Sequence, residues 1–261
     1  MDASAFVRRT SSAILCRMLP ASVHVMPPAF DTVTSYGIGV LAVIVPVLFA
    51  WIVSCGRVAR FFALVAAASV VMGVSAMCAA SGLLSRFDSM PPPMMVMIVG
   101  VMLLGTGLGL SPPGRDAAAR ASIGALIGLQ SFRLPLELVM HRAGTLGIMP
   151  PQLSFGGYNF DIVTGATACV LGGLLLAGRR VSARMVWLWN LWGIWCLLVI
   201  VVIAATTSPM VRLFGDDPGN LNTWVLFFPY VWLPVSLVTV AIASHVIITR
   251  ALRSPSPSAF H

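Results

Sequence analysis

The chain has 261 residues, of which 58% are hydrophobic and only 9% are charged. A soluble domain carries about a quarter charged residues, so this composition excludes an ordinary water-soluble domain and indicates a lipid bilayer as the solvent. The net charge of +8 comes from 16 basic against 8 acidic residues, and every basic residue is arginine. Without lysine, a retinal-type Schiff base is excluded. Because the arginines lie one to three at a time at the ends of apolar segments, we expect the bilayer, and no nucleic acid, as a partner.

Residues 1–34 precede the first long apolar segment and contain a short, weakly apolar stretch flanked by arginines. That stretch is too short and too interrupted for a secretory signal. We expect residues 1–34 to form an N-terminal extracytoplasmic segment, either a disordered tail or an interfacial segment. Alternatively, the residues before Met26 are an upstream extension of a gene whose true start is Met26. Residues 251–261, at the other end, are expected to form a cytoplasmic tail.

Seven apolar segments follow, and together they predict an all-α integral membrane bundle of seven transmembrane helices over residues 35–250. The segments cover residues 35–54, 61–84, 94–110, 118–141, 162–177, 185–207 and 224–248. A membrane span needs about 17 to 25 apolar residues, so the third and fifth segments are short. Both are rich in glycine, which is typical of tightly packed helices in a bundle or, alternatively, of a broken helix at a binding site.

The distribution of arginine predicts the orientation in the membrane. Nine arginines follow the odd-numbered segments, namely Arg57, Arg60, Arg115, Arg120, Arg179, Arg180, Arg184, Arg250 and Arg253. The alternate loops hold only Arg86, Arg142 and Arg212. Since cytoplasmic loops carry the excess of positive charge, the amino terminus is expected outside and the carboxyl terminus in the cytoplasm.

A group of polar residues interrupts the apolar pattern around the fourth and fifth segments. This candidate polar site consists of Gln130, Arg133, Glu137, His141, Arg142, Asn159 and Asp161. Spacings of three, four and four residues place the first four on one helical face. Counted from Arg120 at 1.5 Å per residue, Arg133 is expected about 20 Å into a hydrocarbon core of about 30 Å. A charge at mid-helix costs at least ~2.5 kcal/mol, so this face must turn to the bundle interior or to a water-filled cavity.

Three interpretations of the candidate polar site stay open. The first is a structural or assembly subunit with an internal ion-pair network, joining Arg133 to Glu137 and Asp161 to Arg142 or His141. The second is small-solute or proton-coupled transport or binding, with Glu137 as the proton carrier and Arg133 binding a small polar or anionic solute. The third is a membrane-embedded enzyme acting on a lipid-linked or extracytoplasmic substrate, which would use His141, Glu137 and Asp161.

Among these specific functions we narrowly favour transport. Known nucleophile, phosphate-binding and zinc motifs are missing from the sequence, and a single histidine beside carboxylates is a poor zinc set. We therefore assign no catalytic, cofactor-binding or metal-binding residue and expect no cofactor. Pro135 lies inside the site and predicts a kink, because it leaves the Ser131 carbonyl without its helical donor.

A second, smaller polar pair is expected between the sixth and seventh segments. Asn190 lies six residues after Arg184, and His245 lies five residues before Arg250. Both are therefore about 8–9 Å from the inner boundary. We predict that these two side chains share a hydrogen bond or a bridging water.

Four stretches of the second half, FRLPLELVMHRAG, GGYNFDIVTGATA, LWNLWG and FPYVWLP, resemble a family of uncharacterised bacterial multi-pass membrane proteins. The resemblance covers about residues 131–250 and brings no activity, substrate or cofactor with it. It implies a seven-span protein of the bacterial inner (plasma) membrane. It gives no oligomeric state.

Overall fold

The computed structural model describes residues 25–253, and all regular secondary structure in that range is helical, which confirms the all-α prediction. The α-helices are α2 (Thr32–Ser54), α3 (Val58–Ala80), α4 (Pro93–Leu110), α5 (Pro112–Arg120), α6 (Ile123–Leu129), α7 (Arg133–Thr145), α8 (Asp161–Leu176), α9 (Ala183–Thr206) and α10 (Thr239–Arg253). The 3-10 turns are η1 (Leu83–Ser85), η2 (Gln130–Phe132), η3 (Pro151–Leu153), η4 (Pro218–Asn220) and η5 (Trp224–Leu226), and η6 (Leu233–Val238) is a π-helix. Most of the two expected terminal segments, residues 1–24 and 254–261, lies outside the described residues.

Six helical stretches within the described range are long and apolar enough to cross a membrane. They are Thr32–Ser54, Val58–Ala80, Pro93–Leu110, Ile123–Thr145, Ala183–Thr206 and Leu233–Arg253. α8 corresponds to the fifth predicted segment and is apolar, but it is shorter, with 16 residues. The structure therefore has an apolar helix at each predicted segment, and six of these helices reach spanning length.

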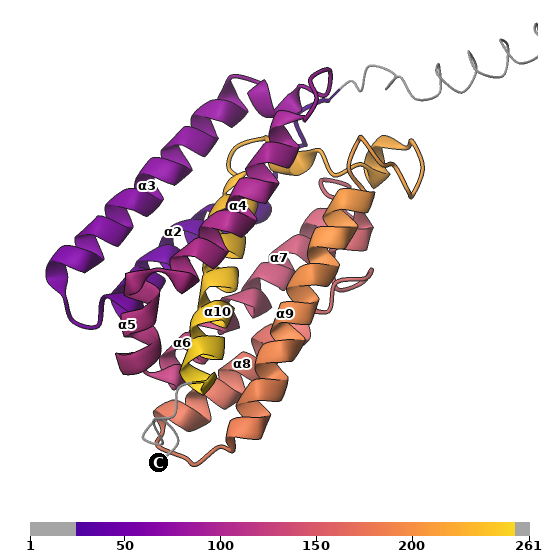
Figure 1. The fold of residues 1–261 in the computed structure, drawn as a ribbon. Helices are drawn as coiled ribbons and strands as arrows, with labels where there is room; N and C mark the ends of the chain where they lie inside the picture. The colour runs from indigo at the N-terminus through magenta and orange to yellow at the C-terminus, as the bar shows by residue number, and fades with distance from the viewer. Residues whose placement is uncertain (1–24, 254–261) are drawn as a thin grey trace, which may run out of the picture.

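The long helices lie side by side, with α3 and α9 at opposite edges and α10 in the middle (Figure 1). α10 packs against α4, α5, α6 and α9. Two-thirds (67%) of the most apolar stretch of Leu233–Arg253 is buried, against 11% for α3. The described chain starts at one end of the bundle, near Asp31, and finishes at the opposite end, near Arg253 (Figure 1). These ends are called the Asp31 end and the Arg253 end below.

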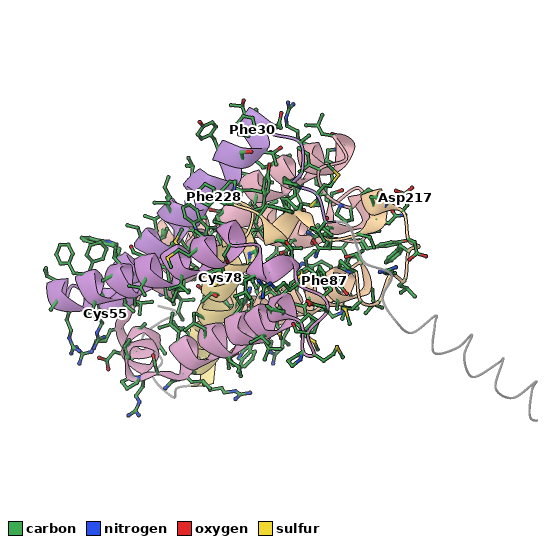
Figure 2. The ribbon with its side chains drawn as sticks, turned by 90° about the horizontal axis from the view of Figure 1, so that it is seen from above. Phe30, Cys55, Cys78, Phe87, Asp217 and Phe228 are labelled. Atoms are coloured by element: carbon green, nitrogen blue, oxygen red, sulfur yellow. The ribbon has the colours of Figure 1, made fainter. Side chains whose placement is uncertain are left out.

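The outer surface of the bundle is apolar. Large hydrophobic side chains are exposed along α2, α3, α4 and α9, for example Trp51, Phe62, Leu103 and Leu188. Seen from above, Phe30 lies at the outer margin of the bundle (Figure 2). A hydrophobic exterior of this extent is not compatible with water and is what a bilayer requires.

Two predicted segment boundaries are wrong. The fourth segment, expected over residues 118–141, begins at Ile123, because Pro112–Arg120 forms the separate helix α5 at the Arg253 end. The seventh segment, expected from Trp224, begins at Leu233. Trp224 instead starts the turn η5 and is buried at 2% exposure. In both cases apolar residues packed against the bundle were counted as part of a span.

Glycine allows α8 to lie against α6 and α7. A methyl group at Gly172 would overlap the backbone of Gly128, and one at Gly165 would overlap the backbone nitrogen of Leu134. Since lipid gives helices no hydrophobic drive to associate, such close backbone approach is a main source of their packing energy. The bundle-packing interpretation of the glycine-rich fifth segment is therefore correct.

Candidate functional site

Arg133 lies at an interruption of the fourth predicted segment. Pro135 cannot donate a backbone hydrogen bond to the Ser131 carbonyl, and the chain tightens at this point into the 3-10 turn η2. α7 then starts at Arg133. The helix is therefore interrupted just before the proline, and Arg133 lies in the bundle interior at only 1% exposure.

Asp161 is the ion-pair partner of Arg133. Nη1 of Arg133 donates to Oδ1 of Asp161 at 2.7 Å. Asp161 is the first residue of α8 and lies one turn before Gly165, at which α8 touches the backbone of α7. This close approach brings the carboxylate to the guanidinium. The expected pair between Arg133 and Glu137 is therefore wrong, because the neighbouring helix supplies a closer carboxylate.

Glu137 is held by an amide and makes no ion pair within residues 25–253. It is the only glutamate in the chain and is 1% exposed. Its Oε1 accepts a hydrogen bond from Nδ2 of Asn159 at 2.6 Å, and the same nitrogen donates to the Leu153 carbonyl at 3.1 Å. Oδ1 of Asn159 accepts from the backbone N–H of Asp161 at 3.1 Å. Asn159 therefore links the Glu137 carboxyl to the backbone at the start of α8. Oε2 of Glu137 is buried without a hydrogen bond to the described residues.

His245 extends this cluster toward the Arg253 end. Nη2 of Arg133 lies 3.2 Å from Nε2 of His245, and Nδ1 of His245 lies 2.9 Å from Oδ1 of Asn190. Nδ2 of Asn190 donates to Oγ1 of Thr249 at 2.8 Å. The predicted hydrogen bond between Asn190 and His245 is thus present. A continuous series of polar contacts runs from the Leu153 carbonyl to Thr249 and joins α7, α8, α9 and α10.

A small cavity of about 40 Å³ lies beside this cluster. Arg133, Glu137, Asn159 and Asp161 line its polar side. Apolar side chains of η2, α7, α9, η6 and α10 line the rest, among them Leu136, Leu197 and Leu233. This cavity, called the inner cavity below, has room for a water molecule but not for an organic solute.

Three predicted site residues do not join the cluster. The ring of His141 stacks on Phe155, with the ring centroids 4.3 Å apart. Arg142 forms a two-bond ion pair with Asp31 at the Asp31 end, with nitrogen–oxygen distances of 2.7 and 2.9 Å. Gln130 is fully buried, and neither of its amide atoms has a hydrogen bond within the described chain. The expected pairing of Asp161 with Arg142 or His141 is therefore wrong.

The pair of Arg142 and Asp31 ties α7 to the start of α2. Asp31 also caps α2 by accepting from the backbone N–H of Thr34 at 2.9 Å. The Arg142 guanidinium, followed by Thr34, holds the pKa of Asp31 well below its usual range. Arg142 therefore stabilises the surface at the Asp31 end and is not part of the buried cluster.

Sequence reasoning missed His245 as a partner of Arg133 because it placed the two residues at different depths. With the fourth span starting at Ile123, Arg133 lies about 15 Å from the Arg253 end at 1.5 Å per residue. His245 lies eight residues before Arg253, or about 12 Å from the same end. With the fourth span started at Ile123, the sequence would have predicted Arg133 and His245 at similar depths.

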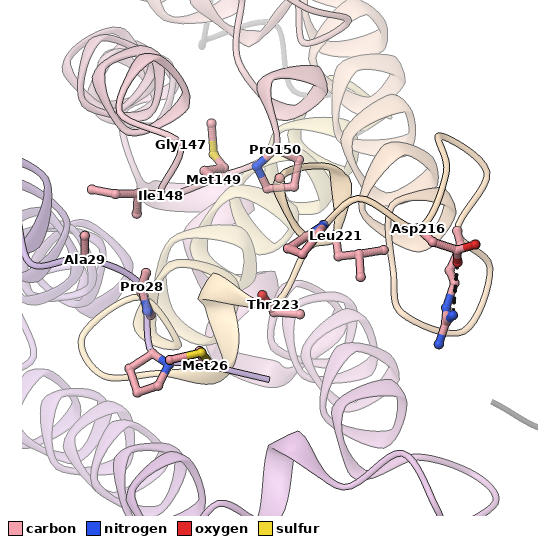
Figure 3. Close-up of a pocket in the computed structure, with 14 residues that line it drawn as sticks. Met26, Pro28, Ala29, Gly147, Ile148, Met149, Pro150, Asp216, Leu221 and Thr223 are labelled. Carbon is pink, nitrogen blue, oxygen red and sulfur yellow. Dashed lines mark hydrogen bonds and ion pairs between the residues drawn. The ribbon is translucent and has the colours of Figure 1, made fainter. Parts of the chain in front are cut away.

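A larger pocket of about 530 Å³ opens at the Asp31 end. It lies between the chain before α2, the loop after α7 and the loop after α9, and it is called the outer pocket below (Figure 3). Its lining includes Met26, Pro28, Ile148, Pro150, Leu221 and Thr223. An ion pair between Arg212 and Asp216, 3.0 Å long, lies at its margin (Figure 3). The volume is in the range of small-molecule binding sites.

The fold and the site together define a class. Six apolar helices of spanning length around a buried ionic cluster are the features of a multi-pass α-helical membrane protein. Comparison with protein-family models, with curated proteins and with solved structures finds no match to this chain. The site must therefore be interpreted from its own chemistry. Among the described residues, His, Cys, Asp and Glu side chains form no group of three that could hold a metal ion.

Proposed function

We propose that this protein is a proton-coupled membrane transporter of a small solute, with Glu137 as the proton-binding group. The proposal starts from the charge balance of the cluster. Arg133 contributes one positive charge, and Asp161 neutralises it at 2.7 Å. Glu137 is a second carboxyl, and no cation among residues 25–253 forms an ion pair with it. An unpaired charge in a membrane interior is costly, so the cluster is balanced when Glu137 carries a proton.

The free oxygen of Glu137 is the observation that carries this proposal. Oε2 is buried and makes no hydrogen bond to the described chain, and the Glu137 side chain lines the inner cavity. A water molecule in that cavity would be a route by which a proton reaches or leaves the carboxyl. A purely structural ion-pair network would explain Arg133 and Asp161, but it would not require a buried carboxyl with an unsatisfied oxygen.

The outer pocket is the place that we assign to the solute. Its lining includes Gly147, Ile148, Met149 and Pro150, which start the loop between α7 and α8. Asn159, which donates a hydrogen bond to Glu137, lies near the end of the same loop. A solute that displaces the start of this loop would therefore act on the hydrogen bond that holds the proton-binding carboxyl, which is a direct means of coupling.

We further propose seven spans, with the amino terminus outside, in a bacterial inner membrane. The excess of arginine at the Arg253 end supports that orientation. The described chain starts and finishes at opposite ends of the bundle, as an odd number of crossings requires (Figure 1). α8 would then be a short span of about 24 Å, lengthened by the polar turn before Asp161.

Proton movement in proteoliposomes tests the proposal. Vesicles that contain an internal pH-sensitive dye are given a potassium-diffusion potential, and proton entry is followed with and without candidate solutes. Wild type is expected to admit protons in a solute-dependent manner, and Glu137→Gln is expected to abolish this. Asp116→Asn is the matched control, since it removes a surface carboxylate that pairs with Arg57 and Arg60. Equal proton entry in wild type and Glu137→Gln vesicles would contradict the proposal.

A further inference from the structure

The hydrogen bonds around Asn190 have a fixed direction. The single hydroxyl proton of Thr249 is donated to the backbone carbonyl of His245 at 2.8 Å. Oγ1 of Thr249 must then accept from Asn190, so the amide nitrogen of Asn190 faces Thr249 at 2.8 Å. The amide oxygen of Asn190 is left facing Nδ1 of His245 at 2.9 Å. Nδ1 must therefore carry a proton.

The other side of the His245 ring gives the same answer independently. A guanidinium has only donors, so Nη2 of Arg133 can approach Nε2 of His245 at 3.2 Å only if Nε2 is an acceptor. Both ends of the series therefore require one form of the ring, which is neutral, with its proton on Nδ1. A second proton on Nε2 would place two cationic donors against each other inside the membrane.

We propose that His245 is a positioning residue of the proton-binding site. Held by Asn190 as the Nδ1–H tautomer, it fixes one amino group of the Arg133 guanidinium while the other reaches Asp161. Glu137 is then the one member of the cluster that exchanges a proton. The role of His245 in proton binding rests on the proposed function, whereas the assignment of its tautomer does not.

The ring of His245 is closely packed between its neighbours. A methyl group at Gly193 of α9 would overlap the imidazole, and the Trp189 ring lies 5.5 Å from it between centroids. The side chain is 1% exposed. The groups that face it are Arg133 from α7, with Asp161 of α8 behind the guanidinium, and Asn190 with Trp189 from α9.

Two substitutions of similar size distinguish a hydrogen-bonding role of His245 from a role in packing alone. In His245→Gln the amide oxygen can take the place of Nε2 and accept from Arg133. In His245→Asn the shorter amide reaches only the place of Nδ1, and Arg133 loses its acceptor. We expect the Gln variant to keep Glu137-dependent proton uptake within about threefold of wild type and the Asn variant to lose about ten- to a hundredfold, as expected for a lost hydrogen bond to a charged group.

The test combines this proteoliposome assay with nitrogen NMR of histidine-labelled protein in nanodiscs. His245 signals are assigned by their absence from the Gln variant. We expect the neutral Nδ1–H pattern to persist between about pH 5 and pH 8, where an ordinary histidine titrates. An Nε2–H pattern or an ordinary titration would overturn the proposal. So would equal uptake by the Gln and Asn variants when wild-type uptake depends on Glu137. If wild type shows no such uptake, the proposed function fails, whereas the tautomer is still decided by the NMR spectrum.

Discussion

Replacing Asp161 by a neutral amide should lower the free energy of unfolding much more than the same replacement at Glu137. Asp161→Asn removes the partner of a guanidinium that is 1% exposed, and the ion pair it breaks is 2.7 Å long. At a charge separation of about 4 Å and an effective dielectric constant of about 20, the lost attraction is about 4 kcal/mol. This agrees with the roughly 3–5 kcal/mol observed when one member of a buried ion pair is removed.

Glu137→Gln should cost far less. The amide keeps an oxygen for the hydrogen bond from Asn159 and has the shape of a protonated glutamate. If Glu137 is already neutral, no buried charge is lost, and the free energy of unfolding should fall by less than about 1 kcal/mol. A titration of purified protein from mild detergent into dodecyl sulfate, followed by tryptophan fluorescence, measures both values.

A double variant checks the reasoning behind this contrast. Replacing Arg133 by Met as well as Asp161 by Asn leaves no unpaired charge, so it should regain part of the stability that Asp161→Asn loses. Equal losses for Asp161→Asn and Glu137→Gln would refute the assignment of charge within the cluster. A double variant less stable than Asp161→Asn would show that the penalty does not come from an unpaired guanidinium.

Three further predictions concern packing, pH and orientation. Gly165→Ala should lower the free energy of unfolding by about 1–3 kcal/mol, because the added methyl overlaps the backbone of α7. Gly173→Ala, in open space on the same helix, should be nearly neutral. A similar loss in both variants would count against the close approach of α8 to α7. Arg142 lowers the pKa of Asp31, so this ion pair stabilises the fold above the ordinary pKa of about 3.9, and its contribution declines as the pH falls below that value. The gap in melting temperature between wild type and Asp31→Asn should therefore shrink below about pH 4, and a constant gap would disprove the assignment. A green fluorescent protein fused to the carboxyl terminus should fluoresce in bacteria, and an alkaline phosphatase fused there should be inactive, while the opposite pair of results would reverse the orientation.

The helices could be predicted from the sequence because hydrocarbon imposes a simple requirement on length and composition. Arg133 and Glu137 were also correctly expected to face the bundle interior, since both are buried. What failed was the choice of partners. Residues on one helical face were expected to pair with one another, but Arg133 pairs with Asp161 and Glu137 with Asn159, both of which come from the next loop and helix.

Partner choice depends on how closely two helices approach, and a single sequence gives only weak signals of that distance. Gly165 decides it between α7 and α8, yet it is one of 23 glycines in the chain. The depth of Arg133 was overestimated for a similar reason, since α5 looks like the start of a span although it is a separate helix. The prediction for Asn190 and His245 succeeded because both residues were counted from arginines that do mark the end of the bundle.

Infrared difference spectroscopy on the protein in lipid gives the most direct measurement, because it detects the carbonyl stretch of a protonated carboxylic acid. At neutral pH, wild type and the surface control Asp116→Asn should both show this band in a water-protected environment, and Glu137→Gln should lack it. A spectrum without the band in wild type, or one in which the band survives in Glu137→Gln, would contradict the claim that Glu137 holds the proton of the cluster.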